Sequence, residues 1–311
     1  MPVSETDYEL YFRLRRGGHG VPFALARAEL LACVHDLPVA VSCENQTRMK
    51  VRLTCPCDLE PELIRRAGFL GYSVALSRVT RVPGGGQEVS QGRRHSGRIL
   101  RGNYRIGHDL VQCEPLWIAD EKERADASPH RREFLLDVEG VPVSSMARRR
   151  YRRLSVCDAR LLLNLARLAE GATVLEPYAG IGGIVVEARR RGMRVICGDV
   201  DPALRLGLAE LSGGLASVWD AGMLPLRDGC CDAVVTEPPY LGSEHDAVAA
   251  TLTEMARCVR PGGRLSVLVT RELAEKVLRA ARGTGLACME TYELRREGSM
   301  VCDALVLQRH D

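Results

Sequence analysis

Four short, mainly apolar segments between residues 173 and 236 are each followed, directly or one residue later, by an acidic residue. The acids are Glu176, Asp199, Asp220 and Glu237. Helical patterns separate the segments, and this order predicts a doubly wound α/β fold with a parallel sheet. Ligands bind beyond the carboxyl ends of the strands in such sheets, so we expect the four acids along one ligand-binding edge.

A glycine-rich loop follows the first apolar segment. Gly180, Gly182 and Gly183 let the backbone turn sharply, and a helical pattern begins directly after them. Strand, glycine loop and helix in this order are typical of a nucleotide-binding unit. Glu176 precedes the glycines, where a carboxylate suits a cationic ligand with an amino group, such as S-adenosylmethionine, and repels a pyrophosphate. A tight turn without a ligand is the alternative for an isolated glycine loop.

The positions of the next two acids predict how they act. Asp199 lies about twenty residues beyond the glycines, where a carboxylate usually holds a ribose diol. Asp201 is followed by a proline, a pattern typical of a helix N-cap. Asp220 could accept from an adenine amino group, although a lone acid there more often caps a loop. The predicted cofactor-binding residues are Glu176, Tyr178, Gly180, Gly182, Asp199, Asp220 and Ala221.

The fourth segment ends in Glu237-Pro238-Pro239-Tyr240, and these residues are predicted to be catalytic. The prolines fix φ and remove two N–H donors, which leaves the Pro238 carbonyl free to accept. An exocyclic amine of a nucleobase is a poor nucleophile because its lone pair is delocalised. Glu237 and the Pro238 carbonyl can hold its two hydrogens, while Tyr240 stacks on the base. Positioning should then carry most of the catalysis, and a rigid turn is the structural alternative.

The half from about residue 144 to 311 resembles the THUMP-associated RNA N2-guanine methyltransferases, most closely the archaeal enzymes that methylate the guanosine at position ten of tRNA. The family usually has Asp-Pro-Phe-Cys-Gly-Thr-Gly-Gly where this chain has Glu176 to Gly183, and it has a helix similar to Arg160–Ala166. Its catalytic loop is normally Asp-Pro-Pro-Tyr. Glu237 departs from that pattern, and the extra methylene moves the carboxylate by about 1.5 Å.

The resemblance implies a Rossmann-like class I methyltransferase domain at residues 154–311, with an antiparallel C-terminal hairpin. A smaller α/β, THUMP-like RNA-binding region is expected at residues 1–140, followed by an arginine-rich linker at 141–153. Hydrophobic patterning within the first region predicts strands at 8–14 and 51–54 and helices at 22–34 and 60–66. The THUMP-like module itself is expected between residues 68 and about 138, from the domain order of the family.

Arginine clusters mark candidate RNA-binding segments. Residues 65–109 contain nine Arg against Glu88 and Asp109, a balance of +7. Arginine-rich, glycine-rich loops are suited to phosphate, although a solvated cationic face is the alternative. The predicted RNA-binding residues are Arg93, Arg94, Arg98, Arg101, Arg148, Arg149, Arg150, Arg152 and Arg153.

Composition limits the partners. The net charge of +3 means that a polyanion must bind a local patch. No segment is apolar enough to span a membrane and the N-terminus does not resemble a signal peptide, so we expect a cytoplasmic protein. The twelve cysteines lack zinc-ligand spacing, and no metal site is predicted. A monomer is expected, with an accessory subunit left open.

The leading hypothesis is a methyltransferase that uses S-adenosylmethionine to add one or two methyl groups to the exocyclic N2 amine of a guanosine in tRNA, at position ten if the resemblance extends so far. Two alternatives stay open. The same loop could serve an adenine N6-methyltransferase acting on RNA or DNA. The chain could also be an RNA-binding protein whose methyltransferase fold is catalytically impaired, because Glu237 departs from the family pattern.

Overall fold

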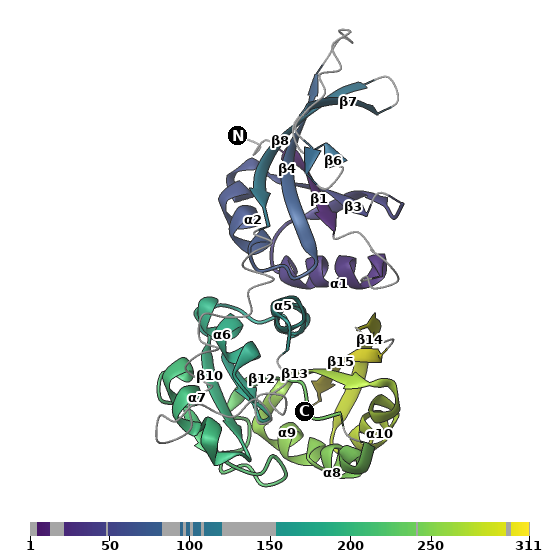
Figure 1. Ribbon diagram of the computed structural model, residues 1–311. Coiled ribbons are helices and arrows are strands. Elements are labelled where there is room, and N and C mark those ends of the chain that lie inside the picture. The colour runs from purple at the N-terminus through teal and green to yellow at the C-terminus, as the bar shows by residue number, and fades with distance from the viewer. Residues whose placement is uncertain are drawn as a thin grey trace. The chain divides into compact units, whose positions relative to one another are not determined.

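The computed structural model describes residues 5–12, 22–47, 49–82, 94–95, 98–99, 102–106, 109–119, 154–240, 242–296 and 300–310. The chain divides into two compact units, Met1–Asp120 and Glu121–Asp311. Each unit is described by itself (Figure 1). The predicted linker at 141–153 lies outside the described residues.

The C-terminal unit is built on a seven-stranded sheet with the order β11-β10-β9-β12-β13-β15-β14. Its strands are β9 (Thr173–Glu176), β10 (Arg194–Asp199), β11 (Ala216–Val218), β12 (Cys231–Thr236), β13 (Val259–Thr270), β14 (Leu286–Arg295) and β15 (Val301–Arg309). Strands β9 to β13 pair in parallel, whereas β15 runs antiparallel to both of its neighbours. The predicted Rossmann-like sheet with an antiparallel C-terminal hairpin is therefore confirmed.

Two groups of helices cover the faces of this sheet (Figure 1). One group contains α5 (Val156–Leu165), α6 (Gly183–Arg190) and α7 (Arg205–Ser212), and the other α8 (His245–Ala250), α9 (Leu252–Cys258) and α10 (Arg271–Ala281). The apolar sides of the second group pack on β12, β13 and β15 in one buried core. None of the described helices is long and apolar enough to cross a membrane.

Sequence patterning was wrong in two places within this unit. Residues 247–259 read as one helix, but α8 and α9 meet at Thr251. The Thr251 hydroxyl donates to the Val248 carbonyl across 2.7 Å, a local bond that competes with continuous helix. The expected turn at Arg260–Gly263 lies inside β13, where the pairing with β12 jumps from Val259 to Arg264 and the intervening residues bulge out.

The N-terminal unit contains an antiparallel sheet with the order β2-β3-β1-β4-β8-β7. Its strands are β1 (Glu5–Phe12), β2 (Ala40–Asn45), β3 (Lys50–Pro56), β4 (Ser73–Val82), β7 (Gly102–Ile106) and β8 (Asp109–Ile118). Its helices are α1 (Phe23–Cys33) and α2 (Glu60–Ala67), the latter preceded by η1 (Cys57–Leu59). Because β4 pairs with β1, residues beyond 68 continue the first sheet. A THUMP-like module stays a prediction.

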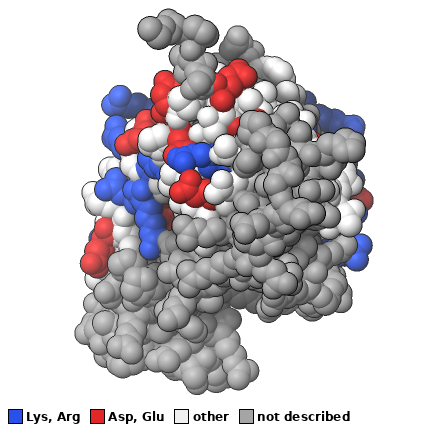
Figure 2. All heavy atoms as spheres, turned by 90° about the horizontal axis from the view of Figure 1, so that it is seen from above, with Lys and Arg blue, Asp and Glu red and all other residues white. Residues whose placement is uncertain are grey.

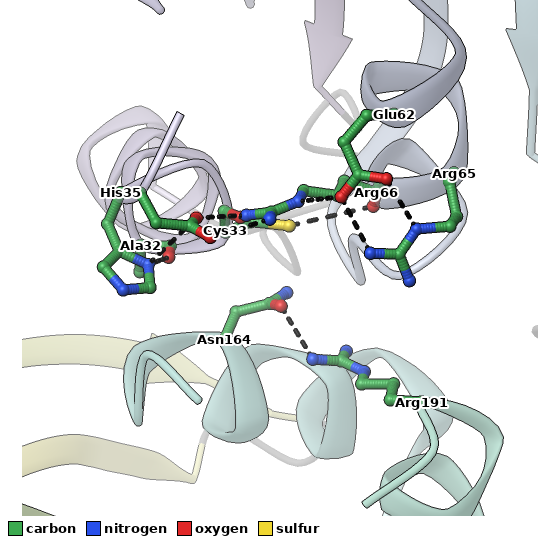
Figure 3. A network of polar contacts seen from close by, with 9 residues as sticks. Ala32, Cys33, His35, Glu62, Arg65, Arg66, Asn164 and Arg191 are labelled. Atoms are coloured by element: carbon green, nitrogen blue, oxygen red, sulfur yellow. Dashed lines mark hydrogen bonds and ion pairs between the residues drawn. The ribbon is translucent and has the colours of Figure 1, made fainter. Parts of the chain in front are cut away.

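Arg66 joins the two helices of this unit (Figure 3). Its guanidinium donates to the Cys33 carbonyl at the end of α1 across 2.6 Å, to Asp36 across 2.9 Å and to Glu62 across 2.7 Å. The hydrogen bond with Arg66 lowers the pKa of Asp36 to about 2. Figure 3 also draws the 2.8 Å bond from Arg191 to Asn164, which links α6 to α5 in the C-terminal unit.

Ion pairs engage part of the positive charge counted in the sequence. Arg65 and Arg66 pair with Glu62, and Arg78 pairs with Glu60 and Glu114. On the face seen in Figure 2, the described basic and acidic side chains are interspersed. The charges of these three arginines are therefore offset by neighbouring glutamates. The balance of +7 in the sequence overstates the positive charge available to a phosphate backbone.

The structure does not describe the side chains of the predicted RNA-binding arginines. Arg94 and Arg98 contribute their backbone to the short strands β5 (Arg94–His95) and β6 (Arg98–Ile99). The side chains of both, together with Arg93, Arg101, Arg148, Arg149, Arg150, Arg152 and Arg153, lie outside the described residues.

Candidate active site

Glu176 ends β9 and is almost fully buried, with 2% of its surface exposed. Its Oε1 accepts from the Thr236 hydroxyl across 2.5 Å and from the Tyr178 backbone N–H across 3.1 Å. Burial raises the pKa of Glu176 to about 8, the two hydrogen bonds oppose that rise, and the charges of Glu237 and Asp199 add to it. Glu176, Asp199 and Glu237 thus lie close enough to interact at one edge of the sheet.

Asp199 ends β10 and shapes the glycine loop. Its Oδ2 accepts from the Gly180 N–H across 2.9 Å, and its Oδ1 accepts from the Asp201 N–H across 3.0 Å. Gly180 has a φ of +50°, and a Cβ there would meet nothing within 4 Å, so the loop is open on that side. A carboxylate oxygen can accept more than one hydrogen bond, so the role predicted for Asp199 with a ribose diol is compatible with both contacts.

Asp201 has the structural role that its sequence position predicts. Its side chain accepts from the Ala203 N–H across 3.0 Å and caps η4 (Pro202–Leu204). Gly182 precedes α6 with a φ of +79°, a conformation that favours glycine, and stands at the N-cap position of that helix. The two acids that follow β10 therefore differ in role: one faces the loop, and the other starts the next helix.

Asp220 and Ala221 follow β11 and differ in exposure. Asp220 is exposed, and its Oδ1 accepts from the Gly222 N–H across 2.8 Å, so it does cap a local turn. Ala221 is buried. Trp219, which no sequence argument had singled out, donates from Nε1 to the Pro177 carbonyl across 3.1 Å and packs against Gly198. This contact fixes the end of β11 against the glycine loop.

Tyr178 connects the glycine loop to the second group of helices. Its hydroxyl lies 3.0 Å from the Thr251 hydroxyl at the start of α9. Burial raises the pKa of Tyr178, the Thr251 contact opposes this, and the charge of Asp220 contributes to the rise. Tyr178 and Asp220 are therefore neighbours in space, as expected for two members of one site.

The Glu237–Tyr240 segment leaves the end of β12 beside the glycine loop of β9. Pro238 is buried, Pro239 is exposed, and Glu237 and Tyr240 are half-buried. The Tyr240 hydroxyl donates to Glu237 Oε1. The carboxylate and the aromatic ring predicted to hold a base are thus adjacent, and they lie next to the carboxyl groups of the predicted cofactor site.

Arg296 and Asp158 also belong to this site, and sequence reasoning missed both. Arg296 follows β14; its Nη1 donates to Glu237 Oε1 and, across 2.6 Å, to the Tyr240 hydroxyl. Its Nη2 donates to Asp158 Oδ2 in α5 across 2.6 Å. Burial lowers the pKa of Arg296, but Asp158 and Glu237 more than offset this and hold it above the ordinary value.

Two exposed apolar side chains follow the acids at the ends of β10 and β11. Val200 follows Asp199 and is 72% exposed, and Met223 lies three residues after Asp220 and is 78% exposed. Exposed aliphatic groups beside a carboxylate offer a surface for a flat, apolar ring. Carboxylates for an amino group and a diol, together with an open glycine loop, fit S-adenosylmethionine.

The strand order, the glycine loop and the placement of the acids define a methyltransferase domain of the Rossmann-like class. In agreement, a family described as "Methyltransferase domain" matches residues 175–267. The match begins within β9 and ends within β13. It includes the glycine loop, the ends of β10 and β11, and Glu237–Tyr240. The domain and its residues indicate S-adenosylmethionine as the cofactor.

Several methyltransferases of known name are similar in sequence to this chain. The chain is 36% identical over 141 residues to a tRNA (guanine(10)-N2)-dimethyltransferase of Methanothermobacter thermautotrophicus, which covers 43% of this chain and 38% of the relative. It is 32% identical over 101 residues to the enzyme of the same name from Methanocaldococcus jannaschii, covering 26% and 27%. The bovine U6 snRNA (guanine-N(2))-methyltransferase THUMPD2 is 24% identical over 265 residues, covering 76% and 44%. The chain thus spans less than two thirds of each of these relatives.

Proposed function

We propose that this chain is an S-adenosylmethionine-dependent methyltransferase that methylates the exocyclic N2 amine of a guanosine in tRNA, at position ten. The observation that carries the proposal is the position of Glu237 and Tyr240 at the end of β12, beside the carboxyl cluster of β9 and β10. The names of the archaeal relatives support the choice of base and of position. Such a substrate would be met in the cytoplasm.

In the proposed reaction the protein acts mainly by holding the amine. Glu237 accepts one N2 hydrogen and the Pro238 carbonyl accepts the other, which favours a pyramidal nitrogen with a directed lone pair. Tyr240 supports the base from one face. The cofactor supplies an electrophilic methyl group on a sulfonium. Glu176 and Asp199 would hold the cofactor, transfer of its methyl group would leave the nitrogen positively charged, and the proton of that nitrogen would pass to Glu237.

Glu237 determines how efficient this arrangement is. Its carboxylate accepts from the Tyr240 hydroxyl, so the extra methylene relative to aspartate does not leave the group without a fixed direction. Near-attack geometry depends on such anchoring. This contact favours an active site over a catalytically impaired fold that only binds RNA.

The N-terminal unit is proposed to contribute RNA binding. Arg93, Arg94, Arg98 and Arg101 lie in an arginine-rich, glycine-rich stretch suited to phosphate, and the second group, from Arg148 to Arg153, precedes the methyltransferase domain. The bovine relative, whose name includes THUMP, aligns over most of the chain, which supports an RNA-binding role for this region. We further propose a monomer, with an accessory subunit as the alternative.

The test is labelled-methyl transfer from S-adenosylmethionine to unmodified tRNA transcripts, with duplex DNA in parallel, followed by nucleoside mass spectrometry. The proposal expects N2-methylguanosine or its dimethyl form at position ten. Glu237→Gln should lower transfer by about 100-fold or more, while cofactor affinity changes little. Asp246→Asn is the matched control, because Asp246 is an exposed acid that pairs with Lys276 away from the site.

Three other outcomes would overturn the proposal in distinct ways. Methyladenine in either substrate would move the assignment to an adenine N6-methyltransferase. Cofactor binding without any product would identify an RNA-binding protein with an impaired catalytic fold, or one that requires a partner. Equal loss of transfer and cofactor affinity in Glu237→Gln would show that Glu237 acts on the cofactor instead of the base.

A further inference from the structure

One guanidinium connects three separate parts of the C-terminal unit. Arg296 lies between β14 and β15, and its backbone N–H donates to the Met300 carbonyl across 2.9 Å. Its side chain is only 20% exposed and reaches Glu237 and Tyr240 with Nη1 and Asp158 with Nη2. Asp158 itself is buried in the first turn of α5, where its N–H donates to the Ser155 hydroxyl that caps the helix.

Arg296 contacts both of the side chains assigned to the target base. It donates to the Glu237 carboxylate, the acceptor proposed for the exocyclic amine. Its Cζ also lies 5.8 Å from the centre of the Tyr240 ring, on the aromatic group proposed to stack with the base. A base that bonds to the same Glu237 oxygen competes with the arginine side chain for it.

The donor pattern of the Arg296 guanidinium indicates which base could bind between Glu237 and Asp158 in its place. A guanidinium is a planar N–C–N fork whose two terminal nitrogens both donate. Guanine presents the same fork on its Watson–Crick edge, where N1–H and the N2 amine are attached to one carbon. Adenine places the acceptor N1 beside its N6 amine, so a second carboxylate would face a lone pair. Two carboxylates that hold a guanidinium side by side therefore match guanine and reject adenine.

We propose that Arg296 is an internal substitute for the target guanine, and that Asp158 and Glu237 accept from the N1–H and the N2 amine of the base once Arg296 has withdrawn. The inference rests on the proposed function for its choice of an N2 amine. It assigns Asp158 as a specificity-determining residue and Arg296 as a side chain that competes with the substrate.

The first test measures nucleoside binding to the full chain and needs no methyl transfer. Removing a competing side chain lowers the apparent Kd, so Arg296→Ala should bind guanosine about tenfold or more tightly than the wild type, with no gain for adenosine. Arg295→Ala is the matched control, because this neighbouring arginine is exposed and pairs with Glu293. Guanidinium chloride at millimolar concentration should compete with guanosine in Arg296→Ala.

Two results of this binding measurement would contradict the inference. Binding of guanidinium but not of guanosine by Arg296→Ala would show that the arginine only neutralises Asp158 and Glu237, and the inference would fall. Equal gains for guanosine and adenosine would also contradict it, because Asp158 and Glu237 would then not discriminate the base edge.

A second variant, Asp158→Asn, keeps Arg296, whose guanidinium retains its bond to Glu237. RNA carrying 2-aminopurine at the target position retains the exocyclic amine and lacks N1–H. The wild type should methylate guanine with a kcat/KM about tenfold or more above that for 2-aminopurine, and Asp158→Asn should reduce this ratio toward one. An unchanged ratio would overturn the role of Asp158. If neither base accepts a methyl group, the proposed function fails, and nucleoside binding decides the inference alone.

Discussion

The Thr236 hydroxyl donates to Glu176 Oε1 across 2.5 Å, joining the last residues of the adjacent strands β12 and β9. The residue after Thr236 is the catalytic candidate Glu237, so one hydrogen bond links the cofactor side of the site to the catalytic loop. Both residues are buried, and no neighbouring cation is among the causes that shift the pKa of Glu176. The protonation state of Glu176 should therefore influence both halves of the site.

Glu176→Gln should change how stability depends on pH. A carboxyl whose folded pKa of about 8 exceeds its ordinary value of 4.5 binds its proton more tightly when folded. The wild type is thus favoured at low pH and loses free energy of unfolding as the pH rises from 4.5 through 8. The glutamine variant lacks this loss. The difference in unfolding free energy between the variant and the wild type should therefore grow between pH 4.5 and 8, by on the order of a few kcal/mol.

Urea unfolding between pH 5 and about pH 8.5 in a Trp117→Phe background, followed by the fluorescence of Trp219 in the C-terminal unit, measures the effect. Glu275→Gln, a change at an exposed position of α10, is the control and should follow the wild type. Parallel pH profiles for Glu176→Gln and the wild type would mean that Glu176 ionises normally within the site.

Asp199 and Asp201 give a matched pair of variants two residues apart. Asp199→Ala removes the carboxylate proposed to hold a ribose diol and should raise the Kd for S-adenosylmethionine by about 10- to 100-fold. Asp201→Ala removes a cap and should cost about 1 kcal/mol of stability without a comparable change in affinity. Calorimetric titration and thermal unfolding of both variants measure the two effects. Similar affinities for the two variants would argue against a ligand role for Asp199.

Local patterning predicted what local forces determine. The glycine loop, the strand-end acids and the Asp201 cap depend on residues within a few positions of one another, and each is found where the sequence places it. Arg296 could not be predicted, because Glu237 and Asp158 lie 59 and 138 positions away in the sequence, and only the folded domain brings the three side chains together. The boundary between α8 and α9 could not be predicted from apolar spacing, because Thr251 keeps helical dihedrals and its N–H still donates to the Ala247 carbonyl across 3.2 Å.

Replacing Arg93, Arg94 and Arg98 together with Ala should weaken tRNA binding and flatten its salt dependence. Each phosphate contact releases counterions when the RNA binds. Loss of three such contacts should therefore reduce the magnitude of the slope of log K against log salt by about 2 to 3. Filter binding across a salt series measures this slope. Arg65→Ala with Arg78→Ala is the control, because both arginines are paired with glutamates and should leave the slope unchanged. If the triple variant keeps the wild-type slope, these three arginines do not contact phosphate.

Arg66→Ala should destabilise the N-terminal unit far more than Arg65→Ala. Arg66 is 17% exposed and bonds to the end of α1 and to two acids, whereas Arg65 is 47% exposed and pairs with Glu62 one turn away. We expect losses of about 1–3 kcal/mol and less than about 0.5 kcal/mol, respectively. Trp117 and Trp219 are the two tryptophans and lie in different units, so a Trp219→Phe background reports the N-terminal unit alone.

The effect of Arg66 should also depend on pH with a defined sign. Arg66 depresses the pKa of Asp36 from 3.8 to about 2, so this part of its contribution is present above pH 3.8 and is lost as the pH falls toward 2. The difference in unfolding free energy between Arg66→Ala and its Trp219→Phe background should therefore shrink over that range. A difference that stays constant down to pH 2 would leave only the bond to the Cys33 carbonyl as the source of the stabilisation, because that acceptor does not titrate.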